Sequence, residues 1–91
     1  MIRIHPGRIL VRELHARGLS ANALALKLRV PANRISEIVN GKRGISAETA
    51  LRLGRYLGTG PELWVRLQAD YDLAETERRI GKTVRREVEA G

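Results

Sequence analysis

Cysteine and phenylalanine are absent from this 91-residue chain, which has only one Trp and two Tyr. The lack of cysteine excludes disulfides and thiolate metal sites, and it fits a reducing cytoplasm. So few aromatic residues leave the core to Leu, Ile, Val and Ala, and they provide no platform for stacking single-stranded nucleic acid. No apolar run is long enough to span a bilayer, and no signal-peptide pattern is present. We therefore expect one small cytoplasmic domain.

The constellations that carry catalysis or hold cofactors are also missing. His5 and His15 have no cysteine and no paired carboxylates at metal-ligand spacing. No nucleophile-base pair and no glycine-rich phosphate loop is visible in the sequence. We therefore expect a protein that is not an enzyme and has no metal or cofactor.

Acidic residues are scarce in the first two thirds of the chain. Residues 1–58 contain 11 Lys and Arg against 3 Asp and Glu, whereas residues 59–91 contain 6 against 7. A basic domain of this kind is typical of DNA-binding proteins, because Lys and Arg neutralise phosphates. A basic amphipathic segment could instead bind an anionic membrane. No segment combines a lysine-rich face with large exposed apolar residues, so we favour DNA.

The segment 20–43 has the pattern of two short helices joined by a tight turn. Ser20 is suited to cap the first helix, which would bury Leu24, Ala25 and Leu28. Pro31 disfavours helical backbone at the preceding residue and can itself lie in the first turn of the next helix. That second helix is expected from about Ala32 to Asn40, ending at a glycine.

Three further helices are expected around this pair. The first runs from about Pro6 to Arg17, and another from the Ser46 cap to Gly58. The last begins at a capping box in which Thr59 caps the helix and Glu62 reaches back, and it continues toward Arg79. The predicted inward residues of these three helices are Ile9, Leu10, Leu14, Ala50, Leu51, Leu53, Leu57, Leu63, Trp64, Leu67 and Tyr71.

The end of the chain differs from the rest in composition. We divide the sequence into a DNA-binding domain, residues 1–79, and a charged tail, residues 80–91. Ile80, Val84 and Val88 recur every four residues, which permits a short helix with one narrow apolar stripe. Such a stripe is too thin to fold alone. It would pack on the domain, meet a partner or fray.

Segment 20–43 resembles the helix-turn-helix of the phage-repressor-like (Cro/XRE) superfamily, and about residues 5–73 resemble its HigA-type antitoxins. The order and spacing of several motifs make the match specific. These motifs are His5-Pro6-Gly7, Asn33-Arg34-Ile35-Ser36, Asn40-Gly41-Lys42-Arg43, Pro61-Glu62, Trp64 and Leu67-Gln68. The resemblance implies an all-α, five-helix, lambda-repressor-like DNA-binding domain followed by the charged tail.

Two groups of side chains are the candidate DNA contacts. On the second helix of the pair, the residue types match the hydrogen-bonding edges of bases, although Arg34 and Glu37 could instead serve phosphate contact or orient an arginine. The candidate base contacts are Asn33, Arg34, Ser36 and Glu37. The candidate phosphate contacts, at the start of the first helix and after the second, are Ser20, Asn22, Asn40, Lys42 and Arg43.

The chain departs from the superfamily pattern at two positions. Ala21 stands where Gln is frequent and cannot donate a hydrogen bond to DNA, so that contact is in doubt. Arg29 occupies the turn position commonly held by Gly. A non-Gly residue tolerates left-handed backbone at modest cost, so the fold should survive.

Operator recognition by one short helix covers few base pairs, so we expect a homodimer on a pseudo-palindromic site. Trp64, Leu67 and Tyr71 are candidates for the core or the dimer interface. The resemblance further implies autoregulation of an operon and neutralisation of a small basic, HigB-type mRNA-cleaving toxin. An acidic surface at Asp70, Asp72, Glu75 and Glu77 could attract that toxin, or the first helix could bind it. The alternative is a stand-alone repressor without a toxin.

Overall fold

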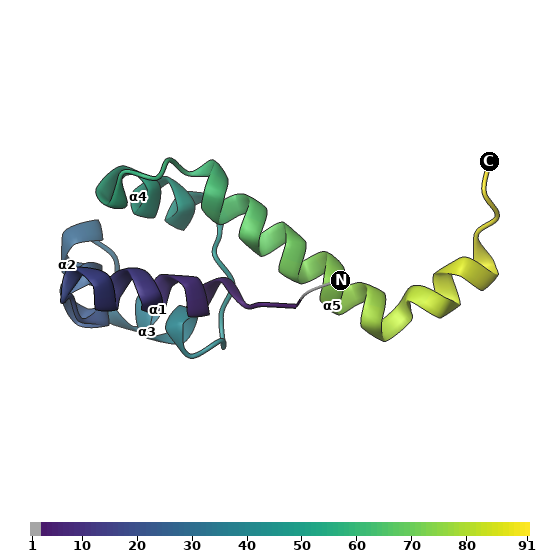
Figure 1. Cartoon of the computed structure of the whole chain (residues 1–91), viewed down its shortest axis with the longest axis horizontal. Helices are drawn as coiled ribbons and strands as arrows, with labels where there is room; N and C mark the ends of the chain where they lie inside the picture. Colours follow the sequence, from purple (N-terminus) through teal and green to yellow (C-terminus); the bar gives the residue numbers. More distant parts are fainter. Residues whose placement is uncertain (1–2) are drawn as a thin grey trace.

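The computed structural model describes residues 3–91, and within this range it is all-α. The helices are α1 (Pro6–Arg17), α2 (Ala21–Leu28), α3 (Ala32–Val39), α4 (Ala47–Leu57) and α5 (Glu62–Glu87). Helices α1 to α4 gather at one end of the molecule, and α5 begins beside α4 and extends away from the others (Figure 1). The predicted fold class, with five helices, is confirmed.

Side-chain caps explain why α1, α2 and α4 begin where the sequence predicts. Ser20 Oγ accepts a hydrogen bond from the Ala23 N–H at 3.0 Å, and Ser46 Oγ accepts one from the Thr49 N–H at 3.2 Å. At α1 the cap is the imidazole of His5, whose Nδ1 accepts from the Gly7 N–H at 2.9 Å. Each cap satisfies a backbone donor that the helix itself leaves free.

The start of α5 differs from the predicted capping box. Pro61 is the N-cap residue and makes no side-chain cap hydrogen bond. Thr59 Oγ1 accepts instead from the indole N–H of Trp64 at 2.9 Å, and it donates to the Gly60 carbonyl. The Trp64 side chain is fully buried, and its donor needs a partner inside the protein. That requirement prevails over the capping motif.

The core lies between α1–α4 and the first turns of α5. Its buried members are Leu10, Leu14, Leu24, Ala25, Leu28, Ile35, Ile38, Ile45, Ala50, Leu53, Leu57 and Trp64. The prediction that Leu51 and Leu63 point into the core is wrong, because Leu51 is 62% exposed and Leu63 is 40% exposed. Leu51 follows the buried Ala50, and Leu63 precedes the buried Trp64. Successive residues differ by 100° around the helix axis, so each leucine points to a different side from its buried neighbour. Ile9 and Leu67 are partly buried against the core.

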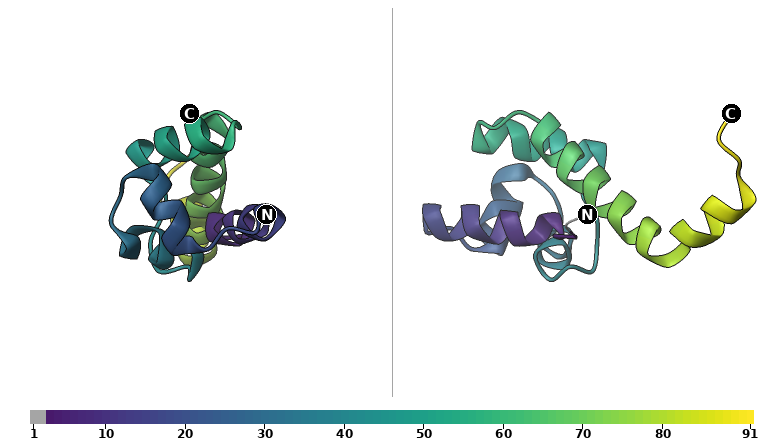
Figure 2. Two further views of the ribbon diagram at one scale, coloured as in Figure 1. Left: turned by 90° about the vertical axis from the view of Figure 1, so that its left-hand side faces the viewer. Right: turned by 45° about the vertical axis from the view of Figure 1, so that its right-hand side comes forward.

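Helix α5 passes its expected end near Arg79 and continues to Glu87. The ribbon changes direction in its last third, and its C-terminal part stands clear of the other helices (Figures 1 and 2). The radius of gyration is 15.4 Å, against about 12 Å for a compact chain of this length. None of the helices in residues 3–91 is long and apolar enough to cross a membrane.

Candidate nucleic-acid interface

Helix α3 presents one buried and one accessible face. Ile35 and Ile38 are fully buried, whereas Asn33 is exposed and Ser36 and Glu37 are half-buried. The Ser36 hydroxyl donates to the Asn33 carbonyl at 3.3 Å, which leaves its lone pairs able to accept. The accessible face therefore offers an amide, a hydroxyl and a carboxylate on one short helix.

Two of the four predicted base contacts are engaged in ion pairs. Arg34 lies 3.5 Å from the Glu48 carboxylate of α4, and Glu37 accepts from Arg43 at 2.7 Å. The Glu37–Arg43 pair joins α3 to the basic loop that follows it. This pair corresponds to the alternative in which Glu37 orients an arginine, here Arg43.

The basic loop after α3 is built on a tight C-terminal turn. Asn40 is the C-cap residue of α3, and Gly41 follows with a φ of +73°, a conformation that favours glycine. The Lys42 N–H then donates to the Glu37 carbonyl at 2.8 Å. Lys42 and Arg43 are exposed at this turn, so the predicted phosphate contacts lie directly beside the accessible face of α3.

Gln68 of α5 fixes the far end of this loop. Its Oε1 accepts from the Ile45 N–H at 2.7 Å, and its Nε2 donates to Asp72 at 2.9 Å. A Cβ at Gly44 would lie 2.9 Å from Gln68 Nε2, so the loop backbone is pressed against this side chain. Sequence reasoning placed Gln68 only within the family motif and assigned it no role. Its contacts join segments that are 23 residues apart, which no local pattern reports.

The other end of the helix pair also faces outward. Ser20 and Asn22, at the start of α2, are exposed, and the Ser20 hydroxyl keeps its donor free when it accepts from the Ala23 amide. Arg29 ends α2 with a φ of +60°, which confirms the left-handed turn predicted for it. Ala21 is partly buried against the core.

The His5-Pro6-Gly7 motif positions α1 against α3. A Cβ at Gly7 would lie 1.9 Å from the Ile38 carbonyl oxygen, so only glycine permits this approach. The His5 ring meets Tyr71 of α5 edge-on, with centroids 4.9 Å apart. One short motif therefore links α3 to α1 and α5.

The three residues predicted for the core or the dimer interface lie on inward faces of α5. Trp64 is fully buried, Leu67 packs partly buried against the core, and Tyr71 is half-buried against His5. The accessible apolar residues of α5 are different ones, and two of them, Ile80 and Val84, belong to the stripe for which the sequence left a partner open. They include Val65, Leu73, Ile80 and Val84, with exposed fractions of 46%, 61%, 42% and 44%.

Comparison with known proteins places this geometry in a family. The helix-turn-helix family model matches residues 10–64. Virulence-associated protein I of Dichelobacter nodosus is 52% identical over 79 residues, which cover 86% of this chain and 73% of that protein. An addiction module antidote protein of the HigA family from Coxiella burnetii superposes with a TM-score of 0.95 at 46% identity, covering 100% of both chains.

A second solved structure contains DNA. The Pseudomonas aeruginosa antitoxin HigA, solved with the higBA promoter, superposes with a TM-score of 0.94 at 44% identity and covers 97% of both chains. The family match spans the helix pair and the core that supports it. The chain belongs to the helix-turn-helix family of the Cro/XRE type, within its branch of HigA antitoxins.

Proposed function

We propose that this protein binds operator DNA with α3 in the major groove. The observation that carries the proposal is the accessible face of α3 beside a basic loop that Gln68 holds in place. A related antitoxin of closely similar structure has been solved with its promoter. Phosphate neutralisation by Lys42 and Arg43 would supply affinity, and α3 would supply sequence readout.

Each candidate contact has a proposed role. Asn33 hydrogen-bonds to adenine through its amide. The Ser36 hydroxyl bonds to a donor or an acceptor group on a base edge. Arg34 contacts guanine or a phosphate once it leaves Glu48, while Glu37 acts by orienting Arg43. The proposed phosphate contacts are Ser20, Asn22, Asn40, Lys42 and Arg43.

Fluorescence anisotropy with a duplex from upstream of its own gene tests DNA binding. The expected result is tight binding that weakens steeply with salt, because counterions are released from the phosphates. A Lys42→Ala, Arg43→Ala variant should bind more weakly, and its affinity should depend less on salt. Equal binding to operator and scrambled duplexes at every salt concentration would contradict sequence-specific recognition.

We infer that the operator-bound form is a homodimer joined through α5. Val65, Leu73, Ile80 and Val84 are spaced so that they follow one side of the helix. They leave an apolar stripe on a helix whose C-terminal part stands clear of the domain (Figure 1). Burial of such a stripe against a second copy would stabilise the pair by roughly 25 cal/mol per Å² of apolar area.

Sedimentation analysis of variants tests the dimer. Leu73→Asp and Ile80→Asp should shift the protein to monomer and weaken operator binding, because a charge cannot be buried in the stripe. Leu26→Asp is the matched control, since Leu26 is 80% exposed on α2. A stripe variant that remains dimeric would rule out this interface.

We further propose that the protein neutralises a small basic, mRNA-cleaving toxin. The support is its membership of the HigA branch. Only part of the acidic surface of α5 is available to attract a basic toxin. Glu75 pairs with Arg3 and Arg78, and Glu77 pairs with Arg85. Asp70 and Asp72 are its exposed remainder.

Purification from the native host followed by mass spectrometry tests for the toxin. A stoichiometric basic partner encoded by the neighbouring gene would establish the antitoxin function. Recovery of the protein alone, still bound to its upstream DNA, would identify a stand-alone repressor. Charge reversal at Asp70 and Asp72 should weaken capture of the toxin if the acidic surface is its docking site.

A further inference from the structure

A second basic surface lies apart from the proposed DNA contacts, between the end of α2 and the outer side of α4. It borders a groove of about 400 Å³, and six of the residues that line it matter here. They are Lys27, Arg29, Leu51, Arg52, Arg55 and Tyr56. Four of the six are cations, and no carboxylate lines the groove.

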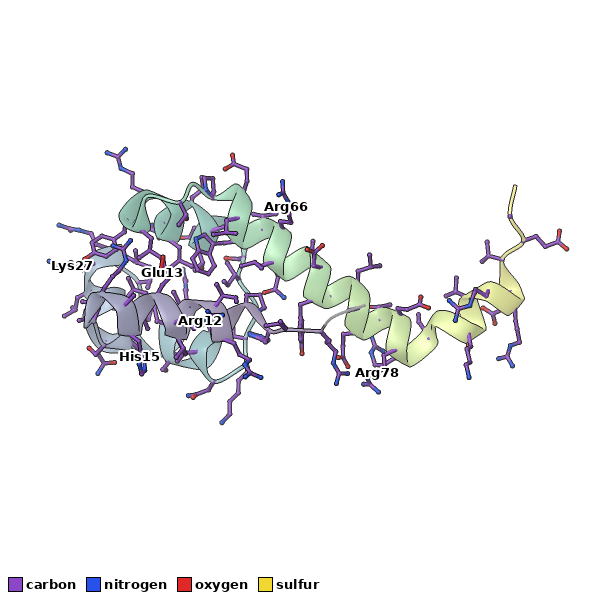
Figure 3. All side chains as sticks on the ribbon, in the orientation of Figure 1. Arg12, Glu13, His15, Lys27, Arg66 and Arg78 are labelled. Atoms are coloured by element: carbon purple, nitrogen blue, oxygen red, sulfur yellow. The ribbon has the colours of Figure 1, made fainter. Side chains whose placement is uncertain are left out.

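The groove lies at the opposite end of α2 from the proposed phosphate contacts on that helix. Lys27 is in the last turn of α2, whereas the proposed phosphate contacts Ser20 and Asn22 are at its first turn. An eight-residue helix places these two ends about 10 Å apart. Figure 3 shows Lys27 at the end of the molecule opposite to the C-terminal part of α5. Lys27 therefore lies away from the first turn of α2, whereas Arg52 shares the Glu48 carboxylate with Arg34 of α3.

One of the four cations is held rigidly and the other three point their charge into solvent. Arg52 donates to the Leu28 carbonyl at 3.0 Å and to Glu48 at 3.1 Å. Lys27, Arg29 and Arg55 are exposed. The Arg29 backbone is in the left-handed conformation, which glycine adopts more readily than arginine does. The groove thus has one guanidinium held by two hydrogen bonds and three other exposed cations.

Apolar side chains lie among these charges. Leu51 is 62% exposed and Tyr56 is 38% exposed on α4. A phosphate chain without apolar groups would pair with the cations but leave Leu51 and Tyr56 in water. An acidic protein segment with a bulky apolar side chain would satisfy both.

We propose that this groove docks an acidic segment of a partner protein, with an aromatic or aliphatic side chain seated between Leu51 and Tyr56. Carboxylates of the segment pair with Lys27, Arg29 and Arg55. Such pairs bring specificity and fast association through complementary charge, and the apolar anchor supplies contact area. This partner differs in charge from the basic toxin, so the groove and the proposed toxin site serve different ligands.

An NMR titration with a short synthetic peptide, in which Asp and Glu surround one Trp and one Leu, tests the proposal. The expected result is a set of shifted backbone amides confined to residues 26–29 and 51–56. A Lys27→Glu, Arg55→Glu variant should bind the peptide about tenfold more weakly or worse. The control variant Arg79→Glu, Arg86→Glu changes the net charge equally on α5 and should bind like the wild type.

Further arms of the experiment distinguish the sources of binding. A peptide with Ser in place of every acid should not bind, and retained operator binding by the groove variant would show that it is folded. Amide shifts at residues 33–43, or equal loss in the groove and control variants, would overturn the proposal. So would a single-stranded oligothymidine that shifts the same amides with equal affinity, because the groove would then be a general polyanion site.

Discussion

Gln68 Oε1 accepts a hydrogen bond from the Ile45 backbone N–H at 2.7 Å, so α5 holds the loop that follows the recognition helix. The same side chain donates to Asp72, which fixes its amide orientation. The helix that carries the proposed dimer stripe therefore also determines the position of Lys42 and Arg43. Gln68 therefore connects the helix of the proposed dimer stripe to the loop of the proposed phosphate contacts.

Gln68→Ala should weaken operator binding while leaving the protein folded. The change frees the loop and leaves the Ile45 N–H without its partner, which costs about 1–3 kcal/mol of stability. Thermal unfolding and anisotropy on the operator measure the two effects. Asp72→Asn is the control, because it retains an acceptor for Gln68 Nε2. A Gln68→Ala protein with unchanged DNA affinity would show that the loop is positioned by other contacts.

Gly7→Ala should destabilise the protein by about 3 kcal/mol or prevent folding. The new methyl group would lie 1.9 Å from the Ile38 carbonyl oxygen, and backbone cannot yield as a flexible side chain does. Gly18→Ala is the matched control, because a Cβ there has nothing within 4 Å. Gly18→Ala should lower the free energy of unfolding by only about 1 kcal/mol, because alanine adopts the left-handed backbone of this position less readily than glycine. Denaturant unfolding that finds the two variants equally stable would refute the close approach of α1 and α3.

Thr59→Val should destabilise the fold through the buried indole of Trp64. The valine removes the acceptor that lies 2.9 Å from Trp64 Nε1, and an unsatisfied buried donor costs about 1–3 kcal/mol. Thr59→Ser keeps the hydroxyl and should remain close to the wild type in denaturant unfolding. A Thr59→Val protein as stable as the wild type would show that the Trp64 indole does not depend on this hydroxyl.

The Glu75 carboxyl should titrate below the ordinary range of a glutamate, because its pKa is lowered. A hydrogen bond from Arg78 is the largest cause of its lowered pKa, and the charge of Arg3 adds to it. A folded-state pKa below the unfolded value stabilises the fold above the ordinary glutamate range, and this stabilisation is lost as the pH falls.

Carboxyl NMR titration measures this pKa directly. Arg78→Gln should raise it toward the ordinary value, while Arg79→Gln should leave it in place. A Glu75 that titrates alike in all three proteins would contradict the ion pair.

The helix-turn-helix could be predicted closely because its signals are local. Ser20, Pro31 and Gly41 act on backbone within a few residues of themselves, so their effect is legible in the sequence. The buried positions Leu24, Ile35 and Ile38 follow the helical period. The helical period and the turn signals likewise predict accessible positions for Asn33 and Lys42, and both residues are exposed.

The remaining features depend on contacts between distant segments. Arg52 bonds the last carbonyl of α2 from the middle of α4, and Gln68 bonds the loop from α5. Thr59 has the spacing of a cap residue, but its hydroxyl accepts a hydrogen bond from the buried Trp64 indole instead. Leu51 has the residue type of a core position but borders the basic groove. Such assignments require the packed structure, because residue type and spacing alone satisfy either alternative.

The central claim is that the exposed face of α3 reads DNA sequence. The most direct test compares wild type with Asn33→Ala, measuring affinity for the operator and for a scrambled duplex at one salt concentration. The variant is expected to lose about 1–3 kcal/mol of binding free energy on the operator and almost none on the scrambled duplex. Equal loss on both duplexes, or no loss on either, would contradict base readout by α3.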